Sequence, residues 1–448
     1  KWTATQGLSR PGRDQVLSDE FRDPATALNH LAQRRDQAIV LLMDFHPYLK
    51  DPVVVRQLRE MARSGPDSRG PMLVMISPEL NLPAELTPLS RRFELRKPER
   101  ADLIEMVHQE AGRWGQTRGQ AAASLCEKTM DRLVDNLAGL TMKDARRLAI
   151  NAIFDDGVLD HRDLGPTMQA KFELLNPDGI LNFELETARF AQVAGMPRIK
   201  RWLKLRSDVF AAAEPPPGLD PPRGMLLLGV QGCGKSLAAR AAAGLFGVPL
   251  LHLDFGALFN RYHGESERNL RQSLDAAEIM APCVMWIDEI EKGLATSDSD
   301  GGTSKRMLGT FLTWLSEHRS RVFVTATAND ISNLPPELMR KGRFDEIFFV
   351  DLPDQATRKA ILEIHLKRRE VKPQLYPLDK LAEATRGFSG AELEHLVVSG
   401  LYLAHAEGTE LTTQHLAEEI KATRPLSVVQ AEDIAQLREW AKTRAVPA

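Results

Sequence analysis

The sequence predicts an α/β fold with a parallel sheet, because short apolar runs alternate with helix-forming segments along most of its length. Met225 to Leu228 is an apolar run suited to a buried parallel strand, and Ser236 to Ala243 is rich in strong helix formers. Strands are expected at 225–229, 249–254, 283–288, 322–327 and 346–351, with helices between them. From residue 353 the pattern becomes a series of helices. We therefore expect a sheet domain over 186–352 followed by a helical region over 353–448.

A second α/β region precedes this one and repeats its plan. Ala38 to Asp44 and Met72 to Ser77 are short apolar runs typical of buried strands, and Val53 to Arg63 between them is helical in character. Further helices are expected at 99–111, 121–137 and 141–149. We therefore expect an α/β domain over residues 1–150 and a connector with few periodic signals over 151–185.

Composition and charge argue against several classes of protein. The chain has 448 residues, of which 43% are hydrophobic and 27% charged, as is typical of globular proteins. A net charge of −3 gives no general attraction to nucleic acid, and no apolar stretch reaches the roughly 20 residues of a membrane span, so neither partner is expected. The three cysteines (Cys126, Cys233 and Cys283) have no metal-binding spacing, and no signal peptide is visible. These features favour a reducing, cytoplasmic location. Because the chain starts at Lys1 and not at Met, we expect further residues before it.

Residues 229–236 have the sequence Gly-Val-Gln-Gly-Cys-Gly-Lys-Ser, which predicts a phosphate-binding loop. Glycines let the backbone curl so that its N–H groups point at phosphate oxygens, Lys235 reaches the β- and γ-phosphates, and Ser236 ligates Mg²⁺. The predicted nucleotide-binding residues of this segment are Gly229, Gly232, Cys233, Gly234, Lys235, Ser236 and Leu237. Cys233 is either a small filler of the loop or, if the nearby N–H dipoles lower its pKa, an oxidisable thiol.

In the segment Cys283 to Lys292, an apolar strand leads to two acidic residues, Asp288 and Glu289. We expect Asp288 to hold Mg²⁺ through water, and Glu289 to orient and activate an attacking water molecule. Behind a phosphate-binding loop, this pair predicts an enzyme that binds ATP and Mg²⁺ and hydrolyses ATP.

Two downstream segments carry a family resemblance. Val322 to Asn329 is a strand that ends in an amide, and Leu338 to Asp345 follows it; together they resemble the second region of homology of the AAA family within the AAA+ ATPases. The resemblance implies that Asn329 is a sensor near the γ-phosphate. It also implies that Arg340 and Arg343 are arginine fingers that reach the nucleotide of a neighbouring subunit. The expected assembly is a homo-oligomer, in this family a hexameric ring.

The resemblance extends to both sides of the nucleotide. Gly387 to Ala391 is similar to the second sensor at the start of a lid helix, where Gly390 and Ala391 let backbone approach the nucleotide, although no arginine is present there. Val193 to Met196, with Ala194 and Gly195, falls where family members contact adenine. The expected fold is thus a P-loop AAA+ domain with a C-terminal helical lid.

The family also suggests how a substrate is gripped. Tyr262, His263 and Gly264 resemble the aromatic–hydrophobic–glycine triplet of a first pore loop, except that His263 occupies the usually hydrophobic position. The glycine-containing polar stretch 295–303 falls where a second pore loop would be. A surface tyrosine without function is the alternative interpretation of Tyr262.

Residues 1–150 are interpreted as a degenerate AAA-like domain. Asp44 ends a strand as Asp288 does, but Phe45 follows it where Glu289 follows Asp288, and Ser77 falls where Asn329 falls. This segment has no glycine loop, so it is not expected to hydrolyse nucleotide. The combination of Asp44 to Tyr48, Leu312 to Leu315, Gly342 to Val350 and the tail from Pro425 to Ala448 is similar to a group of bacterial and chloroplast-encoded AAA proteins, named as a hypothetical chloroplast reading frame, that carry such a degenerate region. An unrelated α/β domain is the alternative.

The expected function is ATP-driven remodelling or threading of a protein substrate through a ring. One alternative is an ATP-controlled switch or scaffold, in which the degenerate region binds a partner and hydrolysis resets assembly. A nucleic-acid motor or loader is a third hypothesis, for which salt-sensitive binding to DNA would be the sign.

Overall fold

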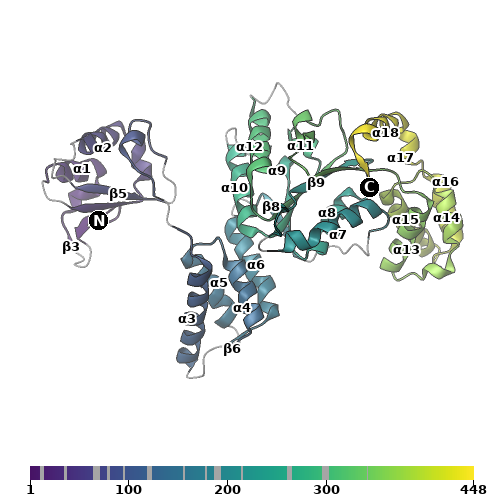
Figure 1. Cartoon of the computed structure of the whole chain (residues 1–448), viewed down its shortest axis with the longest axis horizontal. Helices are drawn as coiled ribbons and strands as arrows, with labels where there is room; N and C mark the ends of the chain where they lie inside the picture. The colour runs from purple at the N-terminus through teal and green to yellow at the C-terminus, as the bar shows by residue number, and fades with distance from the viewer. Residues whose placement is uncertain are drawn as a thin grey trace. The chain divides into compact units, whose positions relative to one another are not determined.

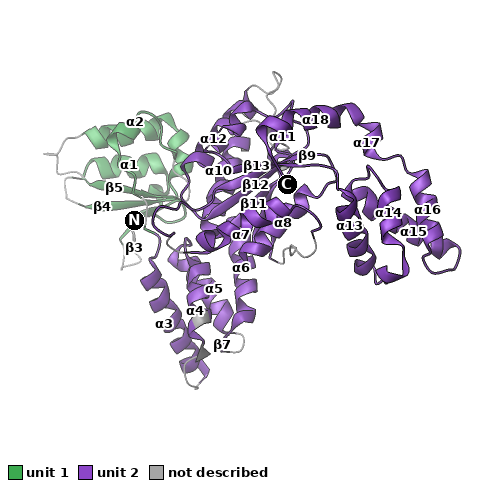
Figure 2. Ribbon diagram, turned by 45° about the vertical axis from the view of Figure 1, so that its right-hand side comes forward, with its two compact units in different colours: residues 1–96 green, residues 97–448 purple. Residues whose placement is uncertain are grey.

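The structure is a computed structural model that forms two compact units, Lys1–Arg96 and Lys97–Ala448 (Figure 2). It describes residues 1–10, 15–34, 38–63, 71–77, 81–93, 96–118, 124–154, 157–176, 179–185, 193–212, 215–259, 265–294, 302–340 and 342–448. No helix within these ranges is both long and apolar enough to cross a bilayer.

The first unit is a small sheet that carries helices α1 and α2. Its elements are β1 (Trp2–Thr3), β2 (Gly7–Arg10), β3 (Gln15–Val16), α1 (Pro24–Ala32), β4 (Ile39–Met43), α2 (Pro52–Arg63) and β5 (Met72–Ile76). The strand order is β3-β2-β1-β4-β5, in which β1, β4 and β5 run parallel and the remaining pairs are antiparallel. The two strands and the helix that the sequence predicts here are therefore confirmed.

The second unit opens with a bundle of four helices. These are α3 (Arg100–Arg118), α4 (Glu127–Leu137), α5 (Met142–Phe154) and α6 (His161–Leu175), with a short parallel pair formed by β6 (Ser124–Leu125) and β7 (Val158–Leu159). The sequence predicted one domain over residues 1–150, whereas the boundary in the structure follows Arg96, because α3, α4 and α5 share a core with α6. Lys171 of α6 is 2% exposed and donates hydrogen bonds to the carbonyls of Ala138 and Ile279 at 2.9 and 2.7 Å. This lysine joins the bundle to the sheet domain.

A seven-stranded sheet forms the centre of the second unit. Its order is β14-β13-β9-β12-β11-β10-β8, and all neighbouring strands are parallel except β8 and β10. The strands are β8 (Leu181–Glu184), β9 (Gly224–Gly229), β10 (Leu250–Leu253), β11 (Cys283–Ile287), β12 (Val322–Ala328), β13 (Glu346–Val350) and β14 (Val446–Pro447). The five strands predicted for this domain are confirmed. The predicted connector, residues 151–185, contains α6 and the edge strand β8.

Helices cover both faces of this sheet, as parallel sheets require (Figure 1). One face packs on α7 (Pro197–Ala211) and α8 (Lys235–Phe246). The other packs mainly on α10 (Glu265–Met280) and α12 (Thr303–Glu317), with the short helices α9 (Phe255–Phe259) and α11 (Ile290–Leu294) beside them. Strands β9, β11 and β12 are buried along their whole length. The central strands are thus rigid supports for the residues at their carboxyl ends.

A helical lid and a C-terminal segment complete the unit. The lid helices are α13 (Gln355–Arg368), α14 (Leu378–Ala384), α15 (Gly390–Ala406) and α16 (Thr413–Ala422), and they share a core of their own. The chain continues through α17 (Leu426–Val429) and α18 (Ala431–Arg444) and then returns to the sheet as β14, beside β13. The expected helical region over 353–448 is confirmed, apart from this final strand.

Candidate active site

The glycine loop joins the end of β9 to the start of α8. Gly229 has φ +142°, and a Cβ there would lie 2.0 Å from the carbonyl oxygen of Val350, so no other residue fits. Gly234 has φ +89° immediately before α8 begins at Lys235. A strand, a glycine turn and a helix N-terminus therefore follow one another, which is the arrangement that binds phosphate through backbone N–H groups and the helix dipole.

Lys235 is buried in this loop. Its side chain is 6% exposed, and its ammonium group donates hydrogen bonds to the carbonyls of Gly229 and Val230 at 2.8 and 2.9 Å. Burial lowers the pKa of Lys235 to about 8. A buried ammonium group within the loop is suited to pair with phosphate, because an anion would compensate its loss of hydration.

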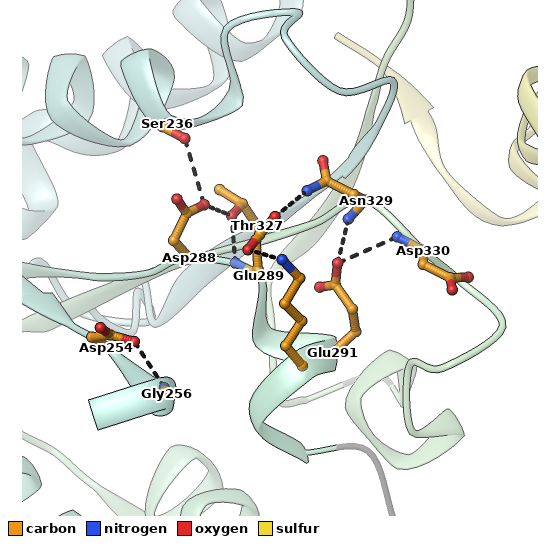
Figure 3. Close-up of polar contacts among 10 residues, drawn as sticks. Ser236, Asp254, Gly256, Asp288, Glu289, Glu291, Thr327, Asn329 and Asp330 are labelled. Atoms are coloured by element: carbon orange, nitrogen blue, oxygen red, sulfur yellow. Dashed lines mark hydrogen bonds and ion pairs between the residues drawn. The ribbon is translucent and has the colours of Figure 1, made fainter. Parts of the chain in front are cut away.

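Asp288 lies at the carboxyl end of β11, opposite the first turn of α8. Its Oδ1 atom is 3.5 Å from the Ser236 hydroxyl, and it accepts a hydrogen bond from the hydroxyl of Thr327 (Figure 3). The Thr327 hydroxyl also accepts a hydrogen bond from the backbone N–H of Glu289 at 3.1 Å. Thr327, on β12, thus orients the acidic turn; the sequence analysis did not identify it. Its position two residues before Asn329, on the same side of the strand, was the available signal.

The oxygen atoms at this position suit Mg²⁺. A hydroxyl and a carboxylate converge there, and Mg²⁺ prefers oxygen ligands. Among the described residues no group of three or more His, Cys, Asp or Glu side chains could hold a metal ion. Mg²⁺ at this site would therefore need ligands from water and from a bound phosphate chain, as is usual for this ion.

Glu289 is placed by donors from two elements. Asn329, at the end of β12, donates from its side-chain amide to Oε1 of Glu289 at 3.0 Å (Figure 3). The Lys292 ammonium group lies 2.5 Å from Oε2. Glu289 has φ +48°, a left-handed conformation that is rare for residues other than glycine. The sequence prediction that the acidic pair and Asn329 belong to one site agrees with this geometry.

Glu291 holds the backbone at the end of β12 through hydrogen bonds. It is 3% exposed, and its Oε1 atom accepts hydrogen bonds from the backbone N–H groups of Asn329 and Asp330 at 2.9 and 3.4 Å. Burial raises the pKa of this carboxyl group. Its position two residues after Glu289 gave no distinct signal in the sequence, so its contact with the β12 end was missed.

The start of the lid helix α15 touches the glycine loop. The backbone N–H of Ala391 donates a hydrogen bond to the carbonyl of Gly232 at 2.9 Å. A Cβ at Gly390 would lie 3.1 Å from the same carbonyl oxygen. These two lid residues, which the sequence analysis assigned to the nucleotide site, do lie against the loop.

A cavity of about 590 Å³ opens beside this contact. It is lined by Ala194 and Gly195, the two predicted adenine contacts, together with Cys233 of the loop and Gly390 of the lid. This volume is within the range of small-ligand sites. Leu237, in the first turn of α8, is 36% exposed and is not among the residues that line the cavity.

Burial argues against the oxidisable-thiol hypothesis for Cys233. Its pKa is raised to about 11, chiefly because burial disfavours the thiolate, and this effect exceeds the opposite influence of Lys235. A raised pKa favours the protonated thiol, and so favours the interpretation of Cys233 as a small filler of the loop.

Arg340 and Arg343 follow the short helical turn Pro336–Met339. The Arg343 guanidinium donates to the carbonyl of Glu337, and Arg340 is exposed. No contact among the described residues joins either arginine to Asp288 or to the glycine loop of the same chain. The proposed pore-loop residues Tyr262, His263 and Gly264, and the stretch 295–301, lie outside the described residues.

The glycine loop, the acidic end of β11, the amide at the end of β12 and the helical lid define a P-loop ATPase of the AAA class. Residues 225–352 match the family described as "ATPase family associated with various cellular activities (AAA)". Residues 1–95 match the N-terminal domain, and residues 101–178 the second domain, of SpoVK-like AAA ATPases. The two family boundaries agree with the separate sheet unit and helical bundle.

Similar proteins show to which group within the AAA family the chain belongs. The AAA domain-containing protein ycf46 of Guillardia theta is 37% identical over 453 residues, which cover 98% of this chain and 86% of the relative. The ycf46 protein of Pyropia yezoensis is 34% identical over 447 residues, with 98% and 88% covered. The ATPase family protein 2 homolog of Caenorhabditis elegans is 34% identical over 249 residues, with 53% and 34% covered. The chain belongs to the AAA ATPase family, in the group of ycf46 AAA domain-containing proteins.

Proposed function

We propose that this protein is a Mg²⁺-dependent ATPase that works in a homo-oligomeric ring, in this family a hexamer, and remodels or threads a protein substrate. The observation that carries the proposal is the convergence of Asp288, Glu289 and Asn329 at the carboxyl ends of β11 and β12, opposite the first turn of α8. Two of these are acidic groups, which would repel a triphosphate without a cation. The Ser236 and Asp288 oxygens are suited to that cation.

Each residue has a distinct role in the proposed reaction. Lys235 would pair with the β- and γ-phosphates, and Ser236 and Asp288 would hold Mg²⁺, which would supply positive charge against the negative charge that develops on the phosphates. Glu289 accepts a proton from the attacking water and aligns it, while Asn329 fixes the Glu289 carboxylate and faces the γ-phosphate. Thr327 and Glu291 hold the two strand ends in register.

The arginines supply the reason for assembly. Charge on the departing phosphoryl group is ordinarily compensated by an arginine, which contributes about 10³ to 10⁵ in rate. Within its own chain Arg343 donates to the carbonyl of Glu337, and Arg340 is exposed. We therefore propose that they complete the site of a neighbouring subunit.

Complementation between two inactive variants tests the shared site. The Arg343→Ala variant retains its own glycine loop and Glu289, but it cannot supply an arginine to the neighbouring subunit. The Glu289→Gln variant can supply that arginine but lacks the base in its own site. Each alone should hydrolyse ATP slowly, and a mixture should regain activity as subunits exchange, with a maximum near equal amounts. The double variant mixed with wild-type protein is the matched control and should only inhibit. A mixture no more active than its components would contradict the shared site.

The protein-threading part of the proposal depends on Tyr262. Tyr262→Ala should leave basal ATP hydrolysis within about twofold and abolish its stimulation by unfolded polypeptide, with Tyr262→Phe as the conservative control. Stimulation retained by Tyr262→Ala would contradict threading. The outcome that would support an ATP-controlled switch is ATPase activity that polypeptide never stimulates.

A further inference from the structure

The cavity beside the glycine loop has a wall that the nucleotide-binding motifs do not supply. Besides Ala194, Gly195 and Gly390, the residues that line it include Lys442, Ala445, Pro447 and Ala448. These four belong to the end of α18 and to the segment of β14. We call residues 425–448 the C-terminal strap.

One end of the strap is fixed to the part of the lid that touches the loop. Glu392 closes a capping box at the start of α15, where its Oε2 atom accepts from the backbone N–H of Ser389 at 2.7 Å. Its Oε1 atom accepts from the backbone N–H of Leu426, also at 2.7 Å. A single carboxylate therefore joins the strap to the helix start that contacts Gly232.

The other end of the strap is fixed to the sheet. β14 pairs in parallel with β13, in the register Phe348 to Val446, and the Ala448 N–H donates to the Phe349 carbonyl at 2.9 Å. Val446 and Ala448 also pack on the core cluster beneath α7 and α8. The strap thus ends as an edge strand of the sheet that carries the loop.

An ion pair holds the middle of the strap. The Arg438 guanidinium contacts the Asp351 carboxylate through Nε and a second nitrogen, at distances of 2.9 to 3.0 Å. Asp351 directly follows β13, two residues before Pro353 at the entrance to the lid. This fork-shaped pair positions α18 at the junction between the sheet and the lid.

We propose that the C-terminal strap forms the third wall of the nucleoside end of the pocket, and that its docking on β13 and the binding of a nucleoside diphosphate stabilise each other. This inference rests on the proposed function, because it assigns the cavity to the same nucleotide. A ligand enclosed by the loop, the lid and the strap binds best when all three are docked. Coupling between two binding events is reciprocal, so the ligand must also favour the docked strap.

Hydrogen exchange on the wild-type protein tests the coupling without any substitution. Addition of ADP should slow exchange of the backbone amides in residues 431–448, as well as in the glycine loop. Lys235→Ala, which should not bind ADP, is the control and should show no change in either segment.

Substitutions that loosen the strap should weaken ADP binding. Arg438→Ala and Asp351→Asn should each raise the Kd for ADP by about two- to fivefold, the range of an exposed ion pair, and the double variant should not add a second increase. Val446→Asp, which places a charge against the sheet, should raise it by about tenfold or more. Gln436→Ala, on an exposed face of the same helix, should bind ADP like the wild type.

The outcomes separate the two proposals. Slowed exchange in 431–448 together with weaker binding by Arg438→Ala supports the strap. If ADP slows exchange in the glycine loop but not in residues 431–448, the proposal that the strap docks with the nucleotide is overturned, while the proposed nucleotide site stands. Wild-type protein that does not bind ADP would contradict the proposed function itself.

Discussion

Each of the two sheets has a residue with left-handed backbone just after one of its strands, the first residue after β4 and the second after β11, but the two turns are used differently. After β4 the chain continues with Asp44, at φ +50°, and after β11 it continues with Asp288 and then Glu289, at φ +48°. In the larger sheet the turn presents carboxylates to Ser236 and Asn329. In the smaller sheet the residue that follows the aspartate is Phe45, which is fully buried.

In the first unit, the residue after the strand-end aspartate packs in the core. The Phe45 ring meets Trp2 edge to face at a centroid distance of 4.9 Å, within the core beneath α1 and α2. Ser77, which occupies the sequence position that matches Asn329, is half-buried, and its hydroxyl oxygen is buried with no hydrogen-bond partner among the described residues. The comparison teaches that a left-handed turn after a strand can serve catalysis only where a base, an amide and a phosphate-binding loop meet at it.

Glu289→Gln should have the largest effect on hydrolysis, because it removes the general base. The first unit has no base at the matching position, where Phe45 stands. The rate of hydrolysis should fall by about 10² to 10⁴ while ATP still binds, since general-base catalysis contributes about that much. Single-turnover hydrolysis and a separate binding titration would measure the two quantities. Rapid turnover by this variant would show that the acidic turn is not catalytic.

Phe45→Ala should damage stability and spare the chemistry. Removal of a fully buried phenylalanine costs about 3–5 kcal/mol of unfolding free energy. The first unit should unfold at lower denaturant concentration, followed through hydrogen exchange of its backbone amides, while ATP binding by the second unit persists. Loss of ATP binding at the same denaturant concentration would mean that the two units do not unfold separately.

Asn329→Ser gives the larger sheet the residue that the smaller one carries. A hydrogen bond to a carboxylate contributes about 1.5–3 kcal/mol, so hydrolysis should slow by about 10- to 100-fold with little change in the Kd for ATP. Ser77→Asn is the matched control in the first unit and should leave hydrolysis unchanged. A weaker ATP affinity with unchanged turnover would contradict the role of Asn329 toward Glu289.

The pH dependence of ADP binding gives the smallest effect. The pKa of Lys235 is lowered to about 8 by burial, and a bound phosphate stabilises the charged form and raises that pKa again. ADP should therefore bind about tenfold more weakly at pH 9 than at pH 7, with proton uptake on binding above pH 8. Calorimetry in two buffers would measure the uptake. Arg343→Ala, with an intact loop, should show the same profile, and a flat profile would contradict the buried ammonium group.

Most of the fold follows from local pattern. Fully buried parallel strands such as β9 and β12 are continuous apolar runs, and the glycine loop has few alternative conformations, so both were predictable. The elements that were not predicted depend on distant partners. β8 exists because Leu181 and its neighbours pair with β10, and Gly165 and Pro166 obscure the helical pattern of α6. β14 has two residues, which give no signal until β13 lies beside them.

The residues of the site likewise include some that the sequence predicts and some that it does not. The motifs Gly229 to Ser236 and Asp288–Glu289 could be identified from the residue pattern, and Asn329 from the family resemblance. Thr327 and Glu291 act through contacts between neighbouring strand ends, which spacing does not encode. The raised pKa of Cys233 depends on how deeply the loop is buried, and this is a property of the packed structure.

The ATPase rate per subunit as a function of protein concentration tests the central claim most directly, with Arg343→Ala measured alongside. A site shared between subunits predicts a rate per subunit that rises with concentration to a plateau in the wild type. In Arg343→Ala the plateau should be lower by about 10³-fold or more. A rate per subunit that is independent of concentration and is retained by Arg343→Ala would mean that one chain completes its own active site, and would contradict the ring ATPase proposed here.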